Sequence, residues 1–122
     1  MRRLRRLLVI LGLMVCGPAG ASAAADMPAC RDLAVMAREL DAVVEMLDRS
    51  GKINEGSALD RNMGELIEGL AVLAEAMDDE DLGLQVEIMR QTWDDMDWKR
   101  FKPAIEAAAR GFERIYRLHC SY

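Results

Sequence analysis

The sequence is poor in the residues on which most enzyme active sites depend. It contains one histidine, His119, and three cysteines in 122 residues. The neighbouring Cys120 points about 100° away from His119 on a helix, and we expect its thiol to be oxidised, which argues against a catalytic Cys–His pair or a hydrolytic triad. No C-x-x-C pair is present, which argues against thiol exchange and thiolate metal binding. We therefore predict no catalytic residue and no enzyme.

Long apolar runs are also scarce. The longest, residues 7–15, is too short to span a bilayer, and nothing after it approaches the roughly 20 residues of a membrane helix. Four arginines precede the run, and Gly17, Pro18 and the small residues 21–23 follow it. This order predicts a cleaved secretory signal peptide over residues 1–23, with the exported domain in residues 24–122. We expect a periplasmic protein without membrane insertion after cleavage.

The three cysteines divide between the leader and the domain. Cys16 follows the apolar run as a lipoprotein cysteine would, but Val15 is a poor residue before it, so we do not expect lipidation. Cys30 and Cys120 remain near the two ends of the domain, and an even pair in an oxidising compartment predicts a disulfide. Closing so long a loop would constrain the unfolded chain by roughly 4–5 kcal/mol in the entropic account.

Basic residues are few in the predicted domain. The chain has 16 basic and 21 acidic residues, and four of the basic ones lie in the leader, which leaves 12 against 21 and a net charge of −9. Such a surface repels nucleic acid and anionic lipid and favours cationic or neutral partners. The acidic run 78–81 lacks the glycine and the spaced carboxylates of a calcium loop, so we interpret it as helix capping in a solvated turn and predict no metal site.

Apolar residues recur at alternating spacings of three and four in four segments, which is the pattern of one helical face. The predicted helices cover about residues 29–49, 58–77, 82–96 and 101–120. Asp81 is expected to cap the third helix, and Pro103 to open the fourth. Short connectors predict an all-α fold, an antiparallel up-down-up-down four-helix bundle. This topology places the first helix's start beside the last helix's end, as a Cys30–Cys120 disulfide requires.

Met36 lies about one turn into the first predicted helix, and His119 falls on the apolar series of the last. With the ending from His119 to Tyr122, H-x-x-Y, and the alanines at 107–109, the chain resembles the cytochrome b562 family of periplasmic haem-binding bundles. The resemblance implies haem b held by Met36 and His119 as axial ligands, and electron transfer. Leu118 stands where that family has tyrosine, and the absence of C-x-x-C-H excludes covalent haem attachment.

These same two residues have plainer interpretations. Met36 also fits the apolar series as ordinary core, and His119 fits a core-edge position near the disulfide. The aromatic residues Trp93, Trp98 and Phe101 surround the third connector. They predict either an exposed docking patch or the closed end of a bundle.

The last segment of the chain is basic, whereas residues 53–97 are strongly acidic. The last helix therefore either lies against acidic neighbours or forms a docking face for an acidic partner. The leading prediction is an exported, non-enzymatic binding or structural module of the cell envelope, without a cofactor. Its partner would be an unidentified protein or a second copy of the chain, and haem b binding is the alternative.

Overall fold

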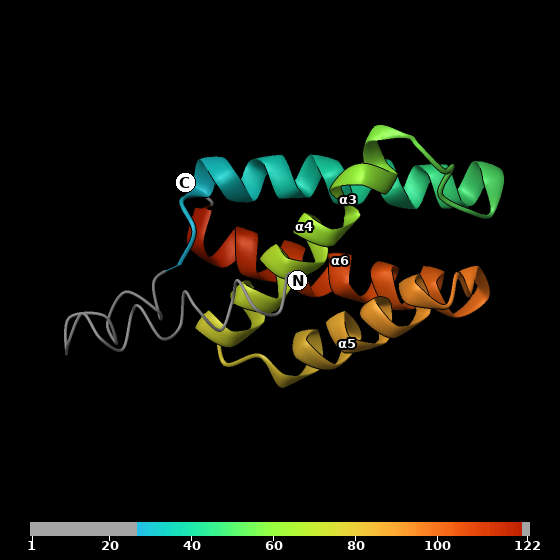
Figure 1. Ribbon diagram of the computed structural model, residues 1–122. Helices are drawn as coiled ribbons and strands as arrows, with labels where there is room; N and C mark the ends of the chain where they lie inside the picture. Colours follow the sequence, from blue (N-terminus) through green and yellow to red (C-terminus); the bar gives the residue numbers. More distant parts are fainter. Residues whose placement is uncertain (1–26, 121–122) are drawn as a thin grey trace, which may run out of the picture.

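The computed structural model describes residues 27–120, which fold into α-helices and contain no strand (Figure 1). The helices are α3 (Cys30–Ser50), α4 (Ala58–Ala76), α5 (Glu80–Asp94) and α6 (Trp98–Cys120). The prediction of an all-α domain with four helices is therefore confirmed. The predicted signal peptide, and with it Cys16, lies outside the described residues.

The helix starts follow from local capping groups. Ser57 caps α4, with its hydroxyl oxygen accepting the N–H of Asp60 at 3.1 Å. In return, the Asp60 carboxylate accepts the N–H of Gly56 at 2.9 Å. Two backbone donors at the start of α4 are thus satisfied by side chains.

The last two helices begin earlier than predicted. Asp79, and not Asp81, caps α5, its carboxylate accepting the N–H of Leu82 at 3.0 Å. α6 begins at Trp98, three residues before the predicted start, because the carboxylate of Asp97 accepts the N–H of Arg100 at 3.3 Å. Pro103 therefore lies inside α6 and does not open it, so one helical hydrogen bond is missing there.

The two connectors that flank α5 share one backbone geometry. Each has a residue in the left-handed conformation, Asp78 with φ +51° and Met96 with φ +53°. The next residues, Asp79 and Asp97, donate their N–H groups at 2.9 Å to the carbonyls five positions earlier. This is the Schellman ending of a helix. Because Asp79 and Asp97 also accept N–H groups of the following helix, each connector needs only three residues.

Helix α6 packs against both α3 and α5, while α4 packs against α5 and α3. Figure 1 shows α3 and α6 lying along each other, with α4 crossing them obliquely. The predicted disulfide is confirmed: Cys30 at the start of α3 is bonded to Cys120 at the end of α6. Near the opposite ends of these helices, Lys102 of α6 donates to Asp48 of α3 at 2.8 Å. The two helices are thus joined covalently at one end and by an ion pair at the other.

The core is built from the predicted apolar faces, together with buried residues that those series do not include, among them Ile67, Ala74 and Ala104. Leu33, Leu40, Val43 and Leu47 of α3 are buried, as are the corresponding residues of α4, α5 and α6. Ile53, in the connector after α3, is also buried. Thr92 is the buried polar residue of this region, and its hydroxyl donates to the Ile88 carbonyl at 2.7 Å. Burying these side chains provides the main favourable contribution to folding.

Candidate functional site

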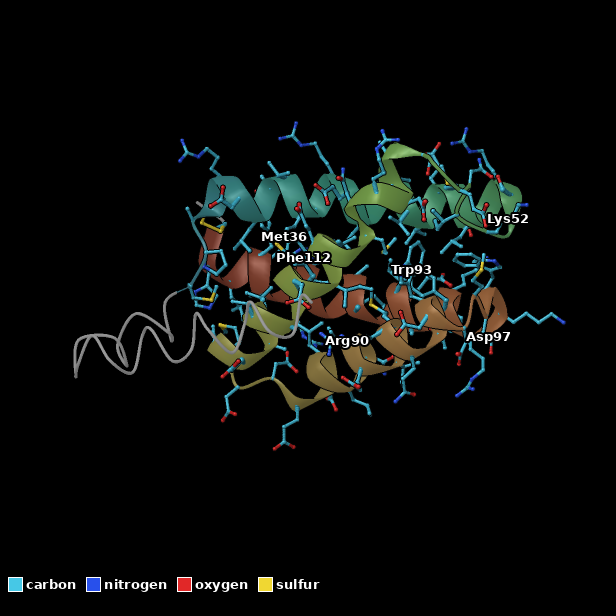
Figure 2. The ribbon with its side chains drawn as sticks, in the orientation of Figure 1. Met36, Lys52, Arg90, Trp93, Asp97 and Phe112 are labelled. Atoms are coloured by element: carbon cyan, nitrogen blue, oxygen red, sulfur yellow. A yellow bond between two sulfur atoms is a disulfide. The ribbon has the colours of Figure 1, made fainter. Side chains whose placement is uncertain are left out.

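The three aromatic residues of the third connector pack against one another. The ring centroids of Trp93 and Trp98 are 5.6 Å apart in an edge-to-face arrangement, and Phe101 lies 5.7 Å from Trp93 and 5.8 Å from Trp98. Phe101 is fully buried, and both tryptophans are half-buried against the core. Figure 2 shows the position of Trp93 in the molecule. Phe101 is therefore not part of an exposed docking patch, and the cluster closes this end of the helices. Met96, in the connector between α5 and α6, is 52% exposed.

The side chain of Met36 is half-buried and directed at α4. A Cβ added to Gly69 of α4 would stand 3.2 Å from the Met36 methyl carbon and 3.5 Å from its sulfur. The glycine thus provides the space that the thioether fills, as a flexible methionine does in an irregular gap. Met36 is a packing residue at the contact between α3 and α4.

His119 is exposed in the last turn of α6, although its spacing had placed it on the apolar series. Its carbonyl oxygen lies 3.6 Å from the sulfur of Cys30. This is a van der Waals contact, since a sulfur in a disulfide carries no proton to donate. The apolar face of α6 ends at Ile115, and beyond it the Cys30–Cys120 disulfide attaches α6 to α3.

A long hollow runs between α3 and α6, and we call it the seam groove. Helix α3 contributes Ala37, Leu40, Asp41, Val44, Glu45 and Asp48. Helix α6 contributes Glu106, Ala109, Arg110, Phe112, Glu113 and Tyr116. The groove consists of two adjoining hollows of about 320 Å³ and 330 Å³, which share Asp41, Ala109 and Arg110. Residues 37–48 span about 16 Å at 1.5 Å per residue, which is enough for a short segment of peptide.

The sequence explains why the seam is hollow. Ala37 of α3 and Ala109 of α6 both line it, and their small side chains leave open the space between the helices. At one end Phe112 and Tyr116 stack with their ring centroids 6.1 Å apart. Phe112 is buried and Tyr116 half-buried, so the apolar hollow has an aromatic wall. No periodic pattern in the sequence indicates this site, because the site depends on which faces of two distant helices meet.

Carboxylates dominate the rim of the seam groove. Three of them have basic neighbours on the same surface: Asp48 with Lys102, Glu113 with Arg117 at 2.7 Å, and Glu45 with Arg49 at 3.9 Å. These pairs are exposed, so each contributes little to stability. The hydrogen bond to Asp48 raises the pKa of the Lys102 ammonium above its ordinary value, and the lysine is charged at neutral pH.

Two other rim carboxylates differ from these. Among residues 27–120, neither Asp41 nor Glu106 has a basic group within 4.0 Å. Both line the hollow of about 330 Å³, together with Arg110. The Glu106 carboxylate still attracts the Lys102 ammonium and helps to raise its pKa, so Asp41 is the rim carboxylate most available to a ligand that enters the groove.

A second hollow, of about 290 Å³, lies between α4 and α5. Arg90 lines it and already pairs with Glu87 at 3.1 Å and with Glu68 at 3.4 Å. In the adjoining acidic run, Asp79 is engaged as the cap of α5, while its neighbours in residues 78–81 are exposed. This agrees with the interpretation of the run as capping in a solvated turn. The α4–α5 hollow is less enclosed than the aromatic end of the seam groove and about as open as its acidic end.

Two further structural results apply to residues 27–120. No group of three or more histidine, cysteine, aspartate or glutamate side chains in this part of the chain is placed to hold a metal ion. None of its helices combines the length and the apolar character that crossing a bilayer requires.

No family model, curated protein or solved structure matches the sequence or the fold.

Proposed function

We propose that this protein is an exported, non-enzymatic binding module of the cell envelope that holds a partner in the seam groove. The observation that carries the proposal is the groove itself, with its apolar floor and its rim of carboxylates. Each hollow is at the lower end of the size range of ligand pockets, about 300–1,000 Å³. Ligand sites in helical bundles commonly lie between helices, as this groove does.

Two features support the location in the periplasm. Residues 1–23 have the order of a secretory signal, and the Cys30–Cys120 disulfide is compatible with an oxidising compartment. The proposed architecture is an antiparallel up-down-up-down bundle, in which the disulfide fixes α3 against α6 and so holds the two walls of the groove in place. Mass spectrometry of the periplasmic fraction should find a chain that begins near residue 24. A cytoplasmic protein that retains residue 1 would contradict the proposed location.

The haem b alternative gains no support from the residues on which it depends. Met36 packs against Gly69 of α4, and the His119 side chain is exposed at the end of α6. Neither residue lines the seam groove. An axial pair needs both side chains to face one cavity that encloses the macrocycle. The two residues do not fit that arrangement, and we assign no role to haem.

The proposed function is tested by filling the groove. Ala109→Leu places a larger apolar side chain where both hollows meet, and it should abolish recovery of the partner in quantitative affinity purification from the periplasm. Ala107→Leu is the matched control, since Ala107 is also half-buried on α6 but lines no part of the groove. Partner recovery that is unchanged by Ala109→Leu, in a variant with native circular dichroism, would remove the seam groove from the proposal.

A further inference from the structure

The seam groove has two chemically different parts. One hollow, of about 320 Å³, is walled by Leu40, Phe112 and Tyr116 and is mainly apolar, although the charged residues Asp41, Arg110 and Glu113 also line it. The other is lined by four carboxylates and Arg110. A ligand that occupies both parts must therefore carry an apolar group and, a few ångströms farther along, positive charge.

The charge of the second part is only partly neutralised from within: Lys102 pairs with Asp48 and also interacts with Glu106, and Arg49 pairs with Glu45. Asp41 and Glu106 have no basic group within 4.0 Å among the described residues, as noted above. The domain as a whole carries an excess of nine acidic residues. The acids concentrate on α4 and α5, so the preference of the groove for a cation comes from its own lining, which has one guanidinium, that of Arg110, and five carboxylates: Asp41, Glu45, Asp48, Glu106 and Glu113.

We infer that the seam groove binds a cationic, amphipathic peptide segment of another protein. An apolar side chain of the segment enters the hollow beside Tyr116, and basic side chains that follow it pair with Asp41 and Glu106. Arginine suits these positions because its planar donors match a carboxylate and stack on aromatic rings. This inference rests on the proposed binding function and specifies the chemistry of the partner.

The test uses a fluorescein-labelled peptide, Leu-Arg-Arg-Leu-Arg-Arg, and the protein with its disulfide intact. Fluorescence anisotropy should show saturable binding, and Asp41→Asn/Glu106→Gln should weaken it at least tenfold. The control Glu65→Gln/Asp94→Asn removes two exposed carboxylates from α4 and α5, which do not line the groove. This control variant should change the affinity for the peptide less than threefold. A peptide with glutamine in place of every arginine should not bind.

Three results would overturn the inference. Equal weakening by the two double variants would mean that only the overall charge attracts the peptide. Spermidine that competes as well as the unlabelled peptide would show that the apolar hollow is not used. Self-association of the protein that is lost in Ala109→Leu would assign the groove to a second copy of the chain.

The inference and the proposed function fail in different ways. If Ala109→Leu abolishes recovery of the natural partner but the arginine peptide does not bind, the groove is a binding site and the cationic assignment is wrong. If Ala109→Leu changes neither the recovery of the natural partner nor the binding of the peptide, the proposed function and the cationic assignment are both wrong. Binding of the peptide that Ala109→Leu weakens and Ala107→Leu leaves unchanged supports both.

Discussion

Met96 occupies a backbone conformation that favours glycine. Its φ of +53° is left-handed, and its side chain is 52% exposed, so little packing offsets the strain. A side chain in this conformation costs about 1–2 kcal/mol, whereas glycine adds about 0.5–1 kcal/mol of unfolded-state entropy. The difference between these two costs is what a substitution at this position measures.

We therefore expect Met96→Gly to be about 0.5–1 kcal/mol more stable than Met96→Ala, since both lose the same side-chain contacts and only one keeps the strained Cβ. Urea unfolding with the disulfide intact measures the difference. A glycine variant that is less stable than the alanine variant would refute this account of the α5–α6 connector.

Met36 and His119 allow a second test at the level of single residues. Because Met36 packs on Gly69 and His119 is exposed, we expect the purified protein to be colourless and to take up hemin without saturation. The visible spectrum, oxidised and then reduced, is the measurement. A sharp Soret band that both Met36→Ala and His119→Ala alter would instead establish the haem alternative and remove the present interpretation of these residues.

At the scale of helices, Gly83 and Gly69 distinguish the general stabilisation gained when alanine replaces a helical glycine from the crowding caused at one particular helix contact. A Cβ on Gly83 of α5 would be 3.9 Å from the Cβ of Ala74, an ordinary contact, so Gly83→Ala should stabilise the protein by about 0.5–1 kcal/mol. A Cβ on Gly69 would be only 3.2 Å from Met36, which must move. Gly69→Ala should therefore stabilise less than Gly83→Ala in the same urea titration.

A third variant identifies the cause of that difference. In a Met36→Ala background the crowding at Gly69 is removed, and Gly69→Ala should then stabilise as much as Gly83→Ala does. Equal gains from the two substitutions in the unaltered protein would mean that Met36 does not pack on Gly69.

Local sequence predicted most of the elements but not all of their ends. The spacing of Leu33, Leu40 and Leu47 indicates a helix whatever the tertiary structure is, and it was confirmed. The start of α5 was placed wrongly because residues 78–81 include several aspartates that can cap a helix, and the backbone turn decides which one does. The periodic series of α6 continued through His119, although the neighbouring core ends before it.

The seam groove could not be predicted from the sequence in the way that the disulfide could. Cysteine pairing was predictable, because only Cys30 and Cys120 remain in the predicted domain. Nothing in the spacing of α3 alone or of α6 alone shows that Ala37 and Ala109 would line one hollow, because that depends on how two helices far apart in sequence are rotated against each other. The available signal was compositional: small residues beside an apolar series on both helices.

At the scale of the whole molecule, the disulfide closes nearly the entire described chain, with a sequence separation of 90 residues. A domain of this size buries a modest core, so the covalent link is a large share of its stability. Reduction should lower the free energy of unfolding by about 2–5 kcal/mol. Urea unfolding with and without a reductant measures this, and Cys30→Ser/Cys120→Ser should match the reduced protein. Equal stability of the oxidised and reduced forms would show that the link is dispensable.

The most direct test of the binding account is site-specific photo-crosslinking in the periplasm. A photoreactive amino acid replaces Arg110, an exposed residue shared by both hollows of the seam groove, or Leu84, which is 58% exposed on α5. We predict one discrete adduct from position 110, suppressed by Ala109→Leu, and none from position 84. Adducts of equal yield from both positions, or an adduct from position 84 alone, would contradict the claim that this protein acts through the groove between α3 and α6.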